Sequence, residues 1–90
     1  MKIIITGAGG FVGQELARVF AADHHIISLT HKALDITDRE TVRAYVNDKR
    51  PDVIINCAVL GVDVCEAHPA LAEAVNVAGP KLLAEAAAEI

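Results

Sequence analysis

The sequence has 90 residues, which is enough for one small domain. Hydrophobic residues make up 53% of the chain and aromatic residues only 3%, so we expect a folded core of Ile, Val, Leu and Ala. The formal net charge is −4 and no block of basic residues occurs, which argues against nucleic acid or an anionic membrane as a partner. A small phosphate-bearing ligand remains compatible with this charge, because backbone amides can hold an anion.

The cysteines and the N-terminal residues indicate the cellular compartment of the protein. Cys57 and Cys65 form no C-x-x-C pair, and no apolar run is long enough to span a membrane. Met1 and Lys2 lead directly into an apolar segment, which leaves no room for a targeting sequence before it. We therefore expect a cytoplasmic protein with reduced thiols. The histidines and cysteines lack the spacing of a metal site, so no metal is expected.

The chain opens with a predicted strand over residues 2–6, a glycine-rich turn and a helix over residues 11–22. Apolar residues recur along this helix at Val12, Leu16, Val19 and Phe20. The turn reads T-G-A-G-G-F-V-G and contains Gly7, Gly10 and Gly13. Glycines let the main chain approach a ligand, and the helix that follows points free N–H groups at an anion. The turn therefore predicts a phosphate site, and the alternative is glycines that serve packing alone.

The next predicted elements are a strand over residues 26–30 and a helix that ends at Lys49. Thr37 and Glu40 have the spacing of a capping box, with Thr37 as the N-cap of this helix. Pro51 stops the helix, because proline cannot continue its hydrogen-bond ladder.

A third apolar run predicts a strand over residues 53–58, followed by a loop or short helix over residues 61–68. A last helix is predicted over residues 70–90, with Pro69 in its first turn. Gly79-Pro80 falls inside this helix and predicts a kink, because Pro80 cannot donate to the carbonyl four residues earlier.

Strands that alternate with helices predict an α/β fold with a parallel sheet and right-handed crossovers. We expect a Rossmann-like, three-layer αβα arrangement with strand order 2-1-3, and a ligand site beyond the carboxyl ends of strands 1 and 3. The open edge of strand 2 or strand 3 could also pair with a second copy of the chain, which would give a homo-oligomer.

Five motifs recur in this order and spacing in one protein family: T-G-A-G-G-F-V-G, L-D-I-T-D, R-P-D-V-I-I-N-C-A, V-D-V-C-E-A-H-P and V-N-V-A-G-P. The chain resembles the N-terminal part of extended short-chain dehydrogenases/reductases that act on nucleotide-sugars. Within these it is most similar to the dTDP-4-dehydrorhamnose reductase group, and the resemblance covers all 90 residues. It implies a nicotinamide dinucleotide as cofactor and, in a full-length form, hydride transfer to the ketone of a nucleotide-sugar.

The resemblance also assigns binding residues. The cofactor pyrophosphate is expected at Gly7, Gly10, Phe11, Val12 and Gly13. Asp35 and Ile36 are expected to border the adenine ring, because a carboxylate can accept from the adenine amino group and Ile36 offers an apolar face. The alternative for Asp35 is a turn residue that caps nearby amides. The nicotinamide-side ribose is expected at Ala58, Val59 and Leu60, in a loop one residue shorter than the reductase pattern.

The end of the second strand bears on the choice of cofactor. An acidic residue commonly binds the ribose 2′-hydroxyl there, whereas this chain has Thr30, His31 and Lys32. A carboxylate would repel a 2′-phosphate and these three side chains would not, so the cofactor is expected to be NADP or NAD. The alternative is that His31 and Lys32 belong to a solvated loop.

Catalytic residues are scarce in this stretch. Asn76 matches the asparagine that supports the proton relay in many short-chain dehydrogenases, and a compatible interpretation is that it satisfies the backbone next to Pro80. The family's Tyr-x-x-x-Lys pair follows a further strand and is not found among these residues. Tyr45 and Lys49 have its spacing without its structural context, so we interpret them as a core-edge residue and a solvated one. A non-catalytic nucleotide-binding or regulatory module, or a self-associating fragment, is the alternative function.

Overall fold

The computed structural model describes residues 1–60 and 62–90, and for residues 62–64 it describes the backbone alone. Its sheet has three parallel strands in the order β2-β1-β3. The central strand β1 (Lys2–Thr6) pairs with β2 (His25–Leu29) and β3 (Val53–Asn56), and Ile4 lies between Ile27 and Ile54. The predicted parallel sheet and its strand order are confirmed.

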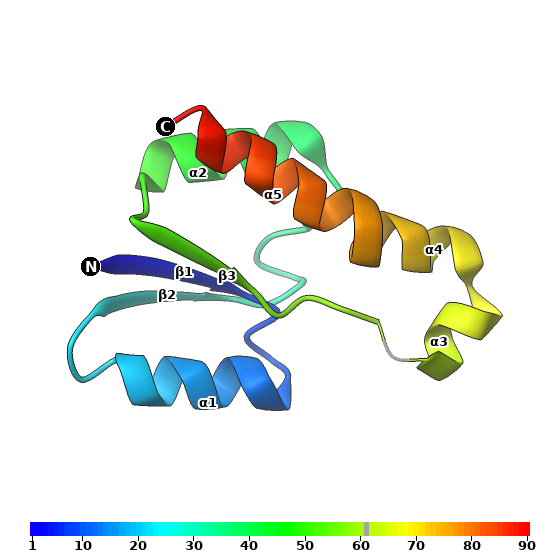
Figure 1. The fold of residues 1–90 in the computed structure, drawn as a ribbon, viewed down its shortest axis with the longest axis horizontal. Helices are drawn as coiled ribbons and strands as arrows, with labels where there is room; N and C mark the ends of the chain where they lie inside the picture. The colour runs from blue at the N-terminus through cyan, green and yellow to red at the C-terminus, as the bar shows by residue number, and fades with distance from the viewer. Residues whose placement is uncertain (61) are drawn as a thin grey trace.

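Helices cover both faces of the sheet (Figure 1). On one face lies α1 (Phe11–Phe20), and on the other lie α2 (Arg39–Lys49) and α5 (Gly79–Ala88), which pack against each other. This is the three-layer αβα arrangement that the alternating elements predict. The segments between β3 and α5 lie beyond the carboxyl ends of the strands; they are α3 (Val62–Ala67), α4 (Pro69–Glu73) and the π-helical turn η1 (Ala74–Ala78).

The core follows the alternation of side chains along β1. Ile3 and Ile5 face α1, while Ile4 between them faces the opposite layer, as the two-residue period of a strand requires. Each of these three side chains is at most 3% exposed. Full burial of such a side chain contributes roughly 1.5–3 kcal/mol, so β1 is the main anchor of the fold. A separate cluster joins α2 and α5; it consists of Ile36, Val42, Val46, Leu83 and Ala86.

The helix α1 presents a different face to the sheet than its apolar spacing predicts. Val12 and Val19 are 60% and 54% exposed, whereas Gly13 is buried and Leu16 and Ala17 pack against the β1 core. A Cβ on Gly13 would lie 2.6 Å from the carbonyl oxygen of Gly7. The side of α1 that contains Gly13, Leu16 and Ala17 therefore lies against the sheet, and a residue with a Cβ at position 13 would not fit there. The helix also ends at residue 20 rather than 22, and β2 begins and ends one residue earlier than predicted.

The cap of α2 is one residue later than predicted. Asp38 is the N-cap, and its carboxylate accepts a hydrogen bond from the Thr41 N–H. The predicted cap, Thr37, instead donates its hydroxyl to Asp35 at 2.6 Å. The prediction of a capping box with Glu40 was therefore wrong, because the Asp35 carboxylate takes the Thr37 hydroxyl.

The strand β3 ends at Asn56, two residues earlier than predicted. The side-chain oxygen of Asn56 accepts hydrogen bonds from the Thr6 hydroxyl at 2.6 Å and from the Ala58 N–H at 3.1 Å. The second bond turns the chain out of the sheet. Asn56 and Cys57 are half-buried, and Cys57 packs against the α1-side core.

The C-terminal third of the chain is helical but not a single α-helix. Pro69 occupies the first turn of α4 as predicted, and the loop or short helix predicted just before it is α3; Gly61 lies outside the described residues. The predicted interruption at Gly79-Pro80 takes the form of η1, where the Gly79 N–H donates to the Ala74 carbonyl five residues earlier. Such a π-helical turn accommodates a break in the α-helical ladder. None of the helices that the structure describes is both long and apolar enough to cross a bilayer.

Candidate functional site

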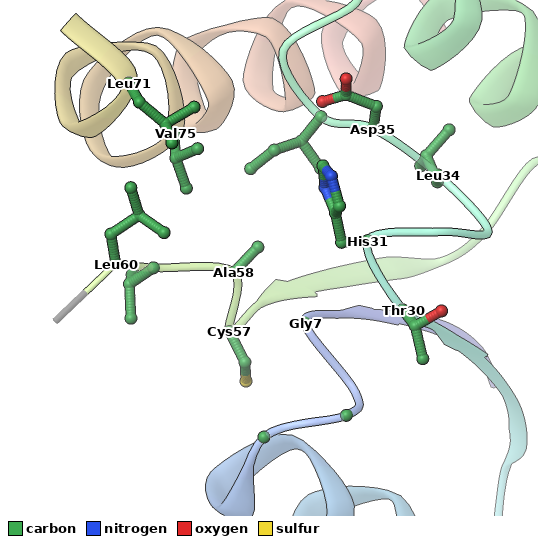
Figure 2. Close-up of a pocket in the computed structure, with 14 residues that line it drawn as sticks. Gly7, Thr30, His31, Leu34, Asp35, Cys57, Ala58, Leu60, Leu71 and Val75 are labelled. Carbon is green, nitrogen blue, oxygen red and sulfur yellow. The ribbon is translucent and has the colours of Figure 1, made fainter. Parts of the chain in front are cut away.

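A cleft of about 360 Å³ opens at the carboxyl ends of the strands. Its walls come from the turn after β1, the loop between β2 and α2, the segment after β3, and the helical run from α4 into η1 (Figure 2). Open parallel sheets bind their ligands in this position. The lining residues are Gly7, Gly9, Gly10, Thr30, His31, Leu34, Asp35, Ile36, Cys57, Ala58, Val59, Leu60, Leu71 and Val75.

The glycine turn forms one wall with its backbone. Gly7 has φ +64°, and a Cβ there would lie 2.4 Å from the carbonyl carbon of Cys57. The Gly10 N–H donates to the Gly7 carbonyl at 3.1 Å and closes the turn, and Gly10 then serves as the N-cap of α1. Within the described part of the chain, no side chain caps this helix, so its first N–H groups remain free for an anion. Gly7 and Gly13 also meet strict packing demands, because a Cβ on either would lie within 2.6 Å of backbone atoms.

The two residues after Gly10 do not line the cleft with their side chains. Phe11 is 83% exposed and Val12 is 60% exposed at the start of α1. Phe11 and Val12 therefore contribute to the site through their backbone N–H groups, which belong to the first turn of α1.

The opposite wall contains Asp35, whose carboxylate organises the loop before α2. Its Oδ1 accepts from the Thr37 hydroxyl at 2.6 Å and from the Thr37 N–H at 2.9 Å. The hydroxyl bond, followed by the N–H bond, lowers the pKa of Asp35, and His31 adds a smaller effect in the same direction. Asp35 is therefore ionised at neutral pH. Its predicted turn role is confirmed, and both bonds described here use Oδ1, which leaves Oδ2 for a ligand.

The end of β2 brings two of its three candidate residues to the cleft. Thr30 and His31 line it, whereas Lys32 is exposed and lies outside the lining set. Ile36 lies at the boundary between the cleft and the α2–α5 core, where it is 4% exposed. Figure 2 shows the His31 ring beside Asp35 on this wall.

The third wall is the segment after β3, where Ala58, Val59 and Leu60 all line the cleft as predicted. The backbone of Leu60 is bonded twice by the side chain of Asn76, at 2.8 Å to its N–H and 3.3 Å to its carbonyl. Asn76 itself does not line the cleft. The hydrogen bonds that the structure describes for its side chain go to Leu60 and Cys65, and none goes to the backbone next to Pro80.

Several lining residues were not predicted from the sequence. Leu71 and Val75 are four apart and face Leu60 and Ala58 across the cleft (Figure 2). Their helical spacing was a usable signal, since residues at i and i+4 share one face of a helix. The other unpredicted lining residues are Gly9, Leu34 and Cys57.

Tyr45 and Lys49 lie on α2 and do not line the cleft. Tyr45 packs against the cluster that contains Ile4 and Leu34, and the Lys49 ammonium lies 5.7 Å from the Tyr45 ring centroid. The interpretation of Tyr45 as a core-edge residue is confirmed.

Comparison with known proteins agrees with this geometry. The family model described as the RmlD substrate-binding domain matches residues 1–90, which is the whole chain. The chain belongs to this family. The resemblance to the dTDP-4-dehydrorhamnose reductase group is confirmed as well, because curated and solved relatives of this chain carry that name.

Three dTDP-4-dehydrorhamnose reductases illustrate how similar this chain is to known proteins. The dTDP-4-dehydrorhamnose reductase of Mycolicibacterium smegmatis is 47% identical over 91 residues, which cover 99% of this chain and 27% of the relative. The solved reductase of Clostridium acetobutylicum superimposes with a TM-score of 0.94 at 41% identity, covering 99% of this chain and 32% of that one. The Bacillus anthracis reductase, which was solved in complex with NADP, superimposes with a TM-score of 0.88 at 36% identity. The match covers 94% of this chain and 31% of that one. The chain thus spans about a third of the length of these relatives.

Proposed function

We propose that this chain is the dinucleotide-binding part of an NADP-dependent oxidoreductase that reduces the ketone of a nucleotide-linked sugar, of the dTDP-4-dehydrorhamnose reductase type. The observation that carries the proposal is the glycine turn at the cleft. There Gly7 has a positive φ, and Gly10 begins a helix whose first N–H groups have no side-chain cap among the described residues and can therefore bind an anion. Family membership over residues 1–90 and the NADP complex of a relative support it.

The lining residues divide the cleft into parts that match a dinucleotide. The pyrophosphate is assigned to the backbone at Gly7 and Gly10 and to the first N–H groups of α1. The adenine is assigned to the wall with Asp35 and Ile36, where the free carboxylate oxygen accepts from the amino group and Ile36 supplies apolar contact. The nicotinamide half is assigned to the wall of residues 58–60.

The end of β2 supports NADP as the preferred cofactor. Thr30 and His31 line the cleft where an acidic residue would favour NAD, and Lys32 follows at the surface. A 2′-phosphate placed beside these residues meets a hydroxyl, an imidazole and an ammonium rather than a carboxylate. The two additional negative charges of NADP therefore favour binding here.

The chain's own part in the reaction is binding and orientation. When bound, NADPH supplies the hydride, and the residues described here fix its two halves against separate walls of the cleft. Tyr45 and Lys49, which have the family's Tyr-x-x-x-Lys spacing, lie on α2 and outside the cleft lining. We therefore expect this 90-residue chain to bind the dinucleotide and to show no turnover of keto-sugars by itself.

Calorimetric titration with NADP⁺ and NAD⁺ tests the proposal. We expect NADP⁺ to bind more tightly than NAD⁺, and the His31→Ala, Lys32→Ala double variant to lose most of that preference while its NAD⁺ affinity stays unchanged. Lys81→Ala is the matched control, because Lys81 is an exposed lysine on α5 outside the cleft lining. Absence of binding of both dinucleotides at millimolar concentration would overturn the proposal.

A further inference from the structure

We propose that Asn76 is a positioning residue that holds the residue 58–60 wall of the cleft in place by bonding the backbone of Leu60. The inference rests on the proposed dinucleotide site and assigns Asn76 a role other than support of a proton relay. Asn76 does not line the cleft, so its influence on a ligand must pass through Leu60, which does.

The Asn76 side chain bonds both backbone groups of Leu60, and we call this pair of bonds the clamp. Asn76 Oδ1 accepts from the Leu60 N–H at 2.8 Å, and Asn76 Nδ2 donates to the Leu60 carbonyl at 3.3 Å. Since β3 ends at Asn56, the backbone of Leu60 lies outside the strand ladder. The Asn76 amide carries one acceptor and a donor group, so it can satisfy both backbone groups of one residue. Leu60 is half-buried, so water can replace these partners only in part, and losing them leaves some of the desolvation cost of the peptide groups uncompensated.

A thiol completes the clamp. Cys65 donates its S–H to the Leu60 carbonyl at 3.5 Å, and its sulfur accepts from Asn76 Nδ2 at 3.4 Å. Asn76, Leu60 and Cys65 therefore bond one another pairwise. The bonds to sulfur are the weaker members, so Asn76 is the group on which the arrangement depends.

The clamp ties two walls of the cleft together. Val75 lines the cleft, while the next residue of η1, Asn76, turns away and bonds Leu60. Figure 2 shows Val75 and Leu60 facing each other on this side of the cleft. Loss of the clamp frees the residue 58–60 wall without touching the wall that contains Asp35. The nicotinamide half of a dinucleotide should then lose affinity while the adenosine half keeps it.

The test compares wild type with Asn76→Ala, using Asn47→Ala as the control, because Asn47 is an exposed asparagine on α2 whose side chain bonds only Arg50 among the described residues. In the ligand-free protein, we expect the Leu60 amide hydrogen of Asn76→Ala to exchange at least about tenfold faster, while β1 amides are unchanged. By titration, NADP⁺ affinity should fall about fivefold to tenfold, and affinity for adenosine 2′,5′-bisphosphate should stay within about twofold.

Two results would overturn the positioning role. One is unchanged exchange of the Leu60 amide in Asn76→Ala, and the other is an equal loss of affinity for both ligands, which marks a general loss of stability. Failure of the proposed function looks different, because wild type would then bind neither ligand although Leu60 exchange still responded to Asn76→Ala. That pattern would reject the dinucleotide site, and the ligand-related part of this inference with it.

Discussion

Ile36 and Gly79 lie so close together that a Cβ on Gly79 would come within 2.6 Å of Ile36 Cδ1. Ile36 lines the cleft and also packs in the α2–α5 core with Val42 and Leu83. The first residue of α5 therefore sets the position of a side chain in the cleft wall. Only a residue without a Cβ allows this approach.

Replacing Gly79 by alanine should therefore displace Ile36. Ile36 is 4% exposed, so it has little free space except toward the cleft, and the overpacking should cost about 1–3 kcal/mol. Urea unfolding of Gly79→Ala measures the loss. Gly9→Ala is the matched control, because its Cβ would meet only the Thr30 methyl at 3.7 Å. Equal stability of the two variants would contradict the close packing of Ile36 on α5.

A second prediction concerns the glycine turn. Gly7→Ala places a Cβ 2.4 Å from the Cys57 carbonyl carbon at a φ of +64°, and backbone cannot yield as a side-chain end can. The left-handed conformation and the clash together should cost about 3 kcal/mol or more, which is a large share of the stability of a small domain. Thermal unfolding followed by circular dichroism measures it. Gly10→Ala should be much milder, because Gly10 has φ −81° and its nearest contact would be 3.5 Å.

The pKa of Asp35 gives a third prediction. Hydrogen bonds from Thr37 hold it below the ordinary value of 3.8, so the carboxylate is favoured in the folded state. A depressed folded pKa contributes stability that is present above the unfolded pKa and is lost as pH falls through the folded value. The Asp35 turn should therefore be intact at neutral pH and loosen only below about pH 3.8.

Thr37→Val tests the cause of that shift. It removes the hydroxyl bond and keeps the N–H bond, so the pKa of Asp35 should rise toward its ordinary value. The pH dependence of the Asp35 carboxyl carbon resonance measures this directly. Thr41→Val is the control, since the Thr41 backbone N–H bonds Asp38 and not Asp35. The same Asp35 pKa in Thr37→Val and wild type would show that the hydroxyl bond is not its main cause.

The sheet edges give a fourth prediction. Within the described sheet, β2 and β3 are both edge strands, and an unpaired edge can add a strand from another chain. We expect the apparent mass in size-exclusion chromatography to rise with protein concentration. Val53→Lys on β3 should shift the chain toward monomer if β3 pairs, and Ser28→Lys on β2 if β2 pairs. A constant monomeric mass over a hundredfold concentration range would exclude association through either edge.

The parts of the fold that local sequence determines could be predicted. The apolar runs gave the three strands. Gly7 and Gly13 located the turn at the cleft, because the positive φ of Gly7 and the close backbone contacts of both leave few other residue types. The turn role of Asp35, which was the alternative to its cofactor role, could be predicted because its bonding partner Thr37 is only two residues away.

Long-range packing explains what the sequence did not show. Leu71 and Val75 reach the cleft only because η1 folds back onto the segment after β3, a contact between distant parts of the chain. The exposed position of Val12 depends on how closely Gly13 approaches the turn after β1. Asp38 rather than Thr37 caps α2 because the Thr37 hydroxyl donates to the Asp35 carboxylate, and the periodicity of the apolar residues does not show such a local bond.

The Asn56 oxygen that accepts from both Thr6 and Ala58 ties the ends of β1 and β3 together where the cleft begins. These segments are thus ordered before a ligand arrives, and association need not include a folding step there. The heat capacity change of nucleotide association should accordingly reflect only the apolar surface that is covered, and the observed rate should rise linearly with nucleotide concentration without reaching a plateau.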